Sequence, residues 1–380
     1  MREYRILLVG GGSGGHVYPL VAVAESLKEK ATSSGVEIKL LALGEGEFLE
    51  KAAKEKNISV RLISAGKLRR YSSLETLKDI FIKIPLSFIQ SLWHVFWFMP
   101  DIVFAKGGYA SVAPVIAAKL YFIPVFIHES DSVPGLANAI LGKIADKIFI
   151  SFKTAEKYFR GKEVVFTGNP TRRNLTQGNK EAAWKFFEFH EPRPTVLVLG
   201  GSQGAQAINE VILSSLVVMT QKLNVIHQCG ESQYKAVRSG LETILREGTR
   251  QYSEPIKRYY RLYSFFDENQ LAMAYAAADM VVSRAGAGAL FEIAQLGKPA
   301  IVVPIPQSPG NHQYLNAFEF SLAGGYLTEE KNFNRENLMR QIELTLNPEN
   351  YAKISAKIKL FATPNAADKI ASEVFQHLNI

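Results

Sequence analysis

A short apolar strand that leads into a cluster of glycines and then into a helix occurs twice in this chain. The first copy is Arg5–Gly10, followed by the turn Gly11–Gly15 and a helical pattern over Val17–Lys30. The second copy is Pro194–Gly200, which opens into the turn Gly200–Gly204. Strand–turn–helix units of this kind build parallel sheets with helices on both faces. The chain is therefore predicted to be an α/β protein in which each copy begins its own sheet.

Further buried-strand candidates follow each copy, and most are separated by helical stretches. They are Glu37–Leu43, Ser59–Ile63, Asp101–Phe104, Pro124–His128, Lys147–Ile150 and Val164–Thr167, then Asn224–His227, Asp279–Ser283 and Pro299–Pro304. The two series predict two Rossmann-like domains, at residues 1–167 and 168–362, with a hinge near Gly168–Pro170. The last helical pattern, within residues 363–380, can pack on either domain.

The composition excludes several classes of protein. With 47% hydrophobic and 21% charged residues over 380 positions, the chain can bury a large core and is not intrinsically disordered. Its one cysteine, Cys229, excludes an intrachain disulfide and a cysteine-rich zinc site, as is typical of a reducing compartment. The apolar run Ile6–Val9 is too short for a signal peptide, so we expect a cytoplasmic protein.

Positive charge is concentrated in the first half of the chain. The net charge is +8, and 22 basic against 16 acidic residues precede Phe166, compared with 22 against 20 after it. Such an excess favours an anionic partner, which can be a nucleic acid, an acidic membrane surface or a phosphorylated substrate. Charge alone does not distinguish among the three.

The segment Ile80–Phe98 is unusually apolar, with 13 hydrophobic residues among its 19. Lys83 and Pro85 count against a spanning helix, and the polar residues fall on one helical stripe. Two interpretations stay open. The helix either packs on the sheet through a broad apolar face, or lies in a membrane interface with aromatic residues such as Trp93 and Trp97 in the bilayer. The nearby basic residues Lys67, Arg69, Arg70 and Lys78 favour the second.

The glycine turns indicate where ligands bind. In open α/β sheets, ligands bind at the carboxyl ends of the strands, so two such turns predict a cleft between the domains. Glycines let backbone amides approach an anion, and the helix that follows adds partial positive charge. The first turn also fits the GxGxxG pattern of nicotinamide enzymes, and Glu45 stands near the expected acidic position. His16, directly after the glycines, argues against that alternative and faces the expected cleft.

A third candidate site spans Ser283–Glu292, where a strand end leads through small residues into a helix. The small residues allow a phosphate to approach the backbone closely. Glu292 lies between apolar neighbours, where an unpaired carboxylate is costly, so we expect it to accept hydrogen bonds from two ribose hydroxyls.

Seven motifs occur in an order that resembles the MurG family of peptidoglycan synthesis. They are GGGSGGHVYP (Gly10–Pro19), GGY (Gly107–Tyr109), HES (His128–Ser130), GNPTR (Gly168–Arg172), GGSQGAQAIN (Gly200–Asn209), SRAGAGALFE (Ser283–Glu292) and HQYLNA (His312–Ala317). The resemblance runs from Arg5 to about Ala317 and so covers most of the chain.

This resemblance implies a GT-B fold, with two Rossmann-like domains facing across a cleft. The implied activity is an inverting transfer of GlcNAc from UDP-GlcNAc to the 4-hydroxyl of MurNAc in undecaprenyl-diphospho-MurNAc-pentapeptide. The implied partners are these two substrates and an anionic membrane surface, with no nucleic acid. The implied location is the cytoplasmic face of the plasma membrane, where the chain would be a peripheral protein.

The resemblance also assigns roles to individual residues. Contacts with the donor are implied for Ser13, Gly14, Gly15, Asp131, Arg172 and Ser202. The turn of Ala287, Gly288, Ala289, Leu290, Phe291 and Glu292 would hold the uridine diphosphate, with Glu292 on the ribose. Phe266 would lie against uracil through its backbone, and Gln313 would reach the sugar hydroxyls. The first glycine turn, His16 and Tyr109 would receive the acceptor.

Three positions depart from the family pattern. Ser130 and Asp131 stand where many members carry Gln and Asn, and His312 stands where Gln is frequent. The carboxylate of Asp131 replaces an amide near an anionic ligand, which puts the donor contact of Asp131 in doubt.

The expected mechanism is a one-step displacement at the anomeric carbon. The first candidate for the base is His16 and the second is Glu129, while His16 can alternatively bind the acceptor diphosphate as a cation. The chain has no Asp-x-Asp pair, so we expect helix N-termini and Arg172 to stabilise the leaving diphosphate, with no tightly bound metal and no cofactor.

Three alternative functions compete with this reaction. The nearest is a GT-B enzyme with another lipid acceptor, such as diacylglycerol. The others are a nicotinamide dehydrogenase and a membrane-binding protein without catalysis. The second glycine turn and Glu292 argue against the last of these.

Overall fold

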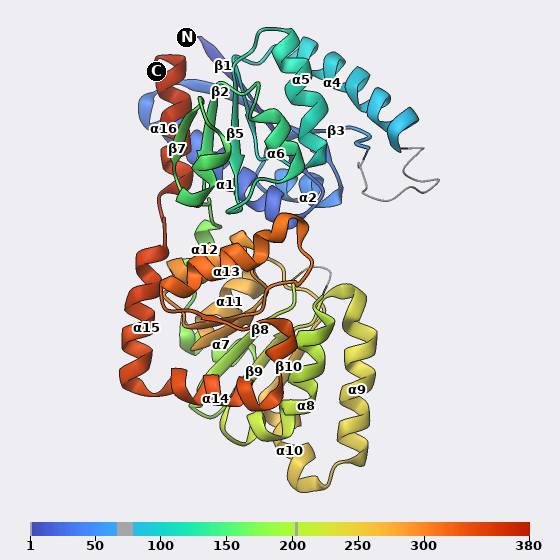
Figure 1. Cartoon of the computed structure of the whole chain (residues 1–380), viewed down its shortest axis with the longest axis vertical. Helices are drawn as coiled ribbons and strands as arrows, with labels where there is room; N and C mark the ends of the chain where they lie inside the picture. The colour runs from blue at the N-terminus through green and yellow to red at the C-terminus, as the bar shows by residue number, and fades with distance from the viewer. Residues whose placement is uncertain (1, 67–78, 202–203) are drawn as a thin grey trace. The chain divides into compact units, whose positions relative to one another are not determined.

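The computed structural model describes residues 2–66, 79–201 and 204–380, which form two compact α/β units (Figure 1). The first unit comprises Met1–Arg172 and Thr363–Ile380, and the second comprises Arg173–Ala362. Ser202 and the basic residues Lys67, Arg69, Arg70 and Lys78 lie outside the described residues.

The first unit is built on a seven-stranded sheet with strand order β3-β2-β1-β4-β5-β6-β7. Every neighbouring pair of strands is parallel. The strands are β1 (Glu3–Gly11), β2 (Glu37–Glu45), β3 (Ser59–Leu62), β4 (Ile102–Ala105), β5 (Val125–Glu129), β6 (Lys147–Ile150) and β7 (Glu163–Phe166). All seven strands were predicted within about two residues. The central strands β4 and β5 are buried along their whole length, whereas the edge strands β3 and β7 are partly or fully exposed.

Helices cover both faces of this sheet. They are α1 (Gly14–Ser34), α2 (Glu47–Glu55), α4 (Ile84–Phe98), α5 (Val112–Leu120), α6 (Leu136–Leu141) and α16 (Ala366–Leu378), with shorter turns η1 (Asp79–Lys83), η2 (Tyr109–Ser111) and η3 (Lys153–Tyr158). Ile6 and Leu8 of β1 point into the core shared with α1 and α16, whereas Leu7 and Val9 point into the core beneath α4 and α5. This alternation is the two-residue repeat of a strand.

The C-terminal helix α16 belongs to the first unit. Its apolar residues, including Ile370 and Val374, pack in the same core as α1. The Ser26 hydroxyl on α1 donates a hydrogen bond of 2.8 Å to the Asp368 carboxylate on α16. The chain therefore enters the second unit after Arg172 and returns at Thr363.

The second unit contains a six-stranded parallel sheet with strand order β10-β9-β8-β11-β12-β13. Its strands are β8 (Thr195–Leu199), β9 (Asn224–Gln228), β10 (Tyr260–Tyr263), β11 (Met280–Ser283), β12 (Ala300–Val302) and β13 (Tyr326–Leu327). The two edge strands, β10 and β13, were not predicted. This sheet confirms the predicted fold class of two parallel-sheet domains.

Helices also pack on both faces of the second sheet. They are α7 (Lys180–Phe186), α8 (Gln206–Lys222), α9 (Tyr234–Glu247), α10 (Arg250–Tyr259), α11 (Glu268–Ala277), α12 (Ala287–Gln295), α13 (His312–Leu322), α14 (Arg335–Leu346) and α15 (Pro348–Phe361), with turns η4 (Arg173–Thr176), η5 (Glu231–Gln233), η6 (Pro309–Asn311) and η7 (Glu330–Asn332). Val196 and Val198 of β8 enter one core, and Leu197 and Leu199 enter the other.

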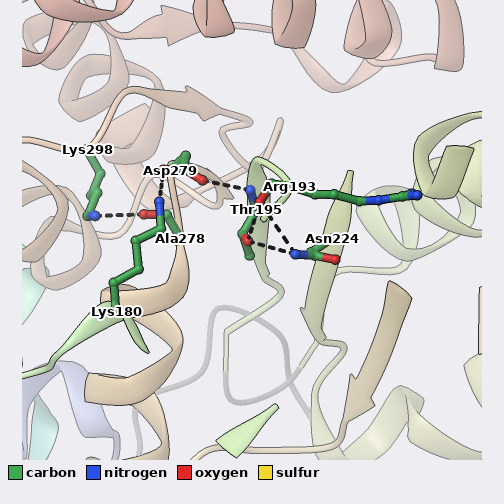
Figure 2. A network of polar contacts seen from close by, with 7 residues as sticks. All are labelled: Lys180, Arg193, Thr195, Asn224, Ala278, Asp279 and Lys298. Atoms are coloured by element: carbon green, nitrogen blue, oxygen red, sulfur yellow. Dashed lines mark hydrogen bonds and ion pairs between the residues drawn. The ribbon is translucent and has the colours of Figure 1, made fainter. Parts of the chain in front are cut away.

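An aspartate directly before a strand accepts a backbone N–H of the neighbouring strand at three places. The pairs are Asp101 with Arg5 at 2.8 Å, Asp146 with Val125 at 2.7 Å, and Asp279 with Thr195 at 2.8 Å. Figure 2 shows the third pair, where the Lys180 ammonium binds the other oxygen of Asp279 at 2.6 Å. These carboxylates satisfy N–H groups at the amino-terminal edges of the sheets, the edges opposite the glycine turns.

Helix α4 is inverted relative to an ordinary surface helix, because its polar stripe faces the protein. Ser87 and Ser91 are buried together with Val95, and the Gln90 side chain accepts a hydrogen bond from the Ser64 backbone at 2.8 Å. The large side chains point outward, among them Ile89, Trp93, Phe96 and Trp97, each at least 52% exposed. The interpretation that this segment buries a broad apolar face is therefore wrong. Within the described ranges, no helix is both long and apolar enough to cross a bilayer.

Candidate active site

The predicted acceptor residues gather at the carboxyl edge of the first sheet. Gly12 has a φ of +86°, and its N–H donates a hydrogen bond of 3.1 Å to the Glu45 carbonyl. A Cβ added at Gly12 would lie 3.0 Å from the Tyr109 ring. Ser13 is the N-cap of α1, and its side chain makes no capping hydrogen bond. Glycine is required at position 12 because the ring of Tyr109 lies directly against the turn.

His16 lies in the first turn of α1 against the turn before Tyr109. A Cβ at Gly108 would stand 3.4 Å from the Nε2 of His16, and the buried Nδ1 of His16 has no hydrogen-bond partner among the described residues. Burial, and secondarily the charge of Lys106, lowers the pKa of His16 to about 4. The imidazole is therefore uncharged at neutral pH, which favours the role of base over that of a cation for the diphosphate.

Glu129, the second candidate for the base, is occupied by its own loop. Its Oε1 accepts the N–H of Asp131 at 2.8 Å, and its Oε2 accepts from the Gly135 N–H at 3.2 Å and the Asn138 amide at 2.9 Å. Burial, followed by the charge of Asp131, raises the pKa of Glu129 to about 7. With both oxygens engaged, Glu129 is better placed to hold the loop after β5 than to accept a substrate proton.

Arg172, predicted to contact the leaving diphosphate, lies beside the first glycine turn. Its guanidinium stands over the ring of Tyr18 on α1, 4.3 Å from the ring centroid. Tyr18 and His16 both come from the beginning of that helix. The structure therefore brings Arg172 to the same helix end as His16.

The predicted diphosphate turn of the second unit forms the N-terminus of α12. Ala287, Leu290 and Phe291 are buried, whereas a Cβ at Gly286 or Gly288 would meet no atom within 4 Å. There is therefore open space beside Gly286 and Gly288 at the start of this helix, the end at which backbone amides lack intrahelical partners. Ala289 is half-buried beside them.

Glu292 is buried one turn further along α12, with 7% of its surface exposed. The hydroxyl of Tyr275 donates a hydrogen bond of 3.4 Å to its Oε2. The expectation that this glutamate is not a solvated surface residue is confirmed. Its role toward a ribose stays a prediction.

Gln228, which the sequence did not single out, joins two predicted donor segments. It ends β9, its amide donates to the Gly201 carbonyl at 3.3 Å, and its Oε1 accepts the Phe266 N–H at 3.2 Å. Phe266 is buried, and with its N–H engaged, a backbone contact with uracil would use the carbonyl oxygen. The position of Gln228 at a strand's carboxyl end was the signal that could have identified it.

Gln313 is held in place by the segment that follows β12. Its Oε1 accepts the Ile305 N–H at 3.1 Å, so its amide N–H groups remain for sugar hydroxyls. The neighbouring His312 is bonded through Nδ1 to the Pro309 carbonyl at 2.7 Å. In the part of the chain that the structure describes, no group of three or more His, Cys, Asp or Glu side chains could hold a metal ion.

A buried histidine fixes the helix that follows the second glycine turn. The Asn209 amide donates to the Cys229 carbonyl at 3.1 Å, so its oxygen accepts the Nε2–H of His227 at 3.0 Å. The Nδ1 of His227 then accepts the Tyr260 hydroxyl at 2.8 Å. Burial lowers the pKa of His227 to about 3, and the ring is therefore neutral.

Replacing His227 with glutamine is expected to change the pH dependence of stability. Between pH values of about 6.5 and 3 the unfolded histidine binds a proton that the folded one does not, so the wild-type unfolding free energy falls by about 1.4 kcal/mol per pH unit on acidification. His227→Gln lacks this slope. Urea denaturation of both proteins at several pH values measures it, and parallel pH curves would contradict the assignment.

Two family models match the chain. Residues 6–150 match the glycosyltransferase family 28 N-terminal domain, and residues 195–370 match the glycosyltransferase family 28 C-terminal domain. The chain belongs to glycosyltransferase family 28. Membership of family 28 makes the chain a glycosyltransferase and excludes the nicotinamide dehydrogenase suggested by the first glycine turn. It also excludes a membrane-binding protein without catalysis.

Family 28 relatives match the chain over nearly its whole length. The UDP-N-acetylglucosamine–N-acetylmuramyl-(pentapeptide) pyrophosphoryl-undecaprenol N-acetylglucosamine transferase of Thermodesulfovibrio yellowstonii is 36% identical, over 96% of each chain. Transferase 2 of the same name from Bacillus cereus is 34% identical, over 91% of this chain and 93% of the relative. The predicted resemblance to the MurG family is confirmed.

Solved structures agree with this assignment. MurG of Acinetobacter baumannii is similar with a TM-score of 0.69 and 25% identity, over 99% of this chain and 100% of that one. A UDP-GlcNAc 2-epimerase from Neisseria meningitidis, bound to UDP-GlcNAc, has a TM-score of 0.69 with 16% identity, over 98% of this chain and 100% of that one. The second likeness shows the fold alone.

Proposed function

We propose that this chain transfers GlcNAc from UDP-GlcNAc to the 4-hydroxyl of MurNAc in undecaprenyl-diphospho-MurNAc-pentapeptide. The observation that carries the proposal is the agreement of relatives that bear this activity in their names over more than nine-tenths of the chain. The reaction is inverting and belongs to cell-wall synthesis. In this proposal UDP-GlcNAc binds the second unit and the lipid-linked acceptor binds the first.

The donor site of this proposal consists of the carboxyl-edge loops of the second unit. The open N-terminus of α12 would bind the diphosphate, because unpaired backbone amides and the helix dipole attract anions. The buried carboxylate of Glu292 would accept ribose hydroxyls, and Gln313 would donate to the sugar. Ser202 is proposed to contribute from the second glycine turn.

The acceptor hydroxyl would attack the anomeric carbon as the bond to the diphosphate breaks. The new bond joins the acceptor oxygen to that carbon, the hydroxyl proton passes to the neutral imidazole of His16, and UDP leaves with the bonding electron pair. Arg172 and the helix N-termini would stabilise the charge that develops on the diphosphate. The first glycine turn, with Ser13 and Tyr109, would receive the acceptor.

A functional assay with three donors tests the proposal. UDP-GlcNAc, UDP-glucose and UDP-galactose are each offered with a short-chain muramyl-diphosphate lipid, and product and released UDP are measured. Product from UDP-GlcNAc is the expected result. A second arm offers diacylglycerol instead, and transfer to that lipid alone would replace the proposed acceptor.

We further propose that the exposed face of α4 binds the cytoplasmic face of the plasma membrane, which makes the chain a peripheral protein. Trp93 and Trp97 are 61% and 65% exposed, and Phe122, after the neighbouring α5, is 92% exposed. Aromatic side chains of this kind are favoured in the headgroup region of a bilayer. The positive net charge of +8 favours anionic lipids.

The double variant Trp93→Ser/Trp97→Ser is expected to weaken binding to anionic vesicles by about tenfold or more, since each buried aromatic side chain contributes about 1.5–3 kcal/mol. Vesicle flotation measures this effect. Phe186→Ser/Leu360→Ser removes two exposed apolar side chains from the second unit and serves as the matched control. Equal flotation of the tryptophan variant and the wild type would contradict the membrane face.

A further inference from the structure

Lys106 is a fully buried lysine to which the proposed mechanism gives no role. It follows β4 at the carboxyl edge of the first sheet, and only 1% of its surface is exposed. Its ammonium donates a hydrogen bond of 2.7 Å to the Nδ1 of His128 and another to the hydroxyl of Ser130. A buried charge is costly unless it has partners, so its retention at this edge calls for a function.

Two chains of hydrogen bonds, one through His128 and one through Ser130, connect Lys106 to the segment by which the chain leaves the first unit. The Nε2 of His128 is 2.9 Å from the Gly168 carbonyl, which can only accept, so the proton is on Nε2 and Nδ1 accepts from Lys106. The Ser130 hydroxyl accepts from Lys106 and donates to the Asn169 oxygen at 3.2 Å. Lys106 therefore anchors Gly168 and Asn169, which shortly precede Arg172, the residue after which the chain enters the second unit.

The charge of Lys106 acts on the loop after β5. Burial lowers its pKa to about 8, while the nearby carboxylates of Glu129 and Asp131 act in the opposite direction. The same ammonium lowers the pKa of His16 and of His128, whose pKa burial also lowers well below its usual value. Lys106 is thus the positive charge among two carboxylates and two neutral imidazoles.

We propose that Lys106 is a positioning residue of the acceptor site, which fixes the loop after β5 against Gly168–Asn169. This inference rests on the proposed function. Without the ammonium, the His128 ring and the Ser130 hydroxyl lose the donor that orients them toward Gly168 and Asn169.

The test measures the acceptor kinetics of Lys106→Met in the full chain. Lys106→Met is expected to raise the acceptor KM and lower kcat, together about 10- to 100-fold in kcat/KM, since the buried donor of two hydrogen-bond chains is removed. UDP affinity is expected to stay within about twofold, because the loops proposed to hold UDP, at α12 and the second glycine turn, belong to the other unit. Lys157→Met, at an exposed lysine of the first unit, is the matched control.

Wild-type acceptor kinetics for Lys106→Met would overturn the inference. A fold defect of Lys106→Met would appear as lost UDP binding or a lowered Tm. In that case Ser130→Ala is the variant to measure, because it breaks one of the two hydrogen-bond chains and removes no charge. It is expected to raise the acceptor KM. Unchanged acceptor kinetics for Ser130→Ala would likewise overturn it.

Failure of the proposed function can be distinguished from failure of the positioning role. If the wild type makes no product, the function is wrong, and hydrogen exchange of the peptides around Glu129–Asn138 and Gly168–Arg172 tests the positioning role without activity. Lys106→Met is expected to speed exchange in both peptides and Lys157→Met in neither. Unchanged exchange for Lys106→Met would overturn the positioning role.

Discussion

Replacing His16 with alanine lowers kcat by about 10²- to 10⁴-fold, the usual contribution of a general base, and leaves UDP affinity at its wild-type value. His16 is expected to accept the proton of the attacking hydroxyl, and within the part of the chain that the structure describes the Nδ1 of its neutral imidazole has no protein partner. The loops proposed to hold UDP, at α12 and the second glycine turn, lie in the second unit, so UDP binding should change little. Single-turnover kinetics with the muramyl acceptor and calorimetry with UDP measure the two quantities.

A second substitution distinguishes a base from a structural role at this position. His16→Gln keeps a polar side chain of similar length against Gly108 but cannot take up a proton near neutral pH. It should therefore be as slow as His16→Ala, while an exposed control in the second unit, His190→Ala, turns over normally. If both His16 variants turn over at close to the wild-type rate, the base assignment is wrong, and Glu129→Gln becomes the variant to measure.

The position of a strand was predictable from the sequence wherever the residues at its ends mark its boundaries. The Lys147–Ile150 strand was predicted to the residue, because Asp146 and Lys147 mark its start and the apolar run Ile148–Ile150 follows. β10 was missed because it begins at Tyr260 directly after α10 ends at Tyr259, with no glycine or proline between them. β13 has two residues, which is shorter than any pattern can detect.

The orientation of α4 shows a second limit of sequence patterns. Spacing correctly placed Ser87 and Ser91 on one stripe, but periodicity reports which residues share a face and not which face is covered. The usual rule turns apolar residues inward, and here the serines are inside. Small side chains let the helix approach the protein closely, while Trp93 and Trp97 remain outside.

The candidate site was predictable in its loops but not in its supporting residues. Glycine turns and Glu292 have local signals, because turn geometry and an acidic residue in an apolar run are visible in the sequence. Lys106 has none, and Gln228 has only its position at the carboxyl end of a strand, since a lysine or glutamine there usually meets solvent. Their roles arise from partners far along the chain, such as Gly168 and Phe266, that only the folded structure brings near.

Glu292→Gln is expected to weaken UDP binding by about 10- to 100-fold. A hydrogen bond to a charged acceptor contributes about 1.5–3 kcal/mol, and glutamine keeps one oxygen but loses the charge. The side chain of Glu292 is buried, so the lost bonds are not replaced by bonds to water. Glu343→Gln, at an exposed carboxylate on α14, is the control and should bind UDP as the wild type does.

Comparison of UDP with 2′-deoxy-UDP locates the contact on the ribose. If Glu292 accepts the 2′-hydroxyl, the wild type discriminates between the two ligands, and Glu292→Gln loses most of that discrimination, because the variant has already lost the charged acceptor. Calorimetry measures the affinities of the wild type and of Glu292→Gln for UDP and for 2′-deoxy-UDP. An equal penalty for the substitution with either ligand would place Glu292 away from the 2′-hydroxyl, and its effect would then come from the helix end that it shares with the diphosphate turn.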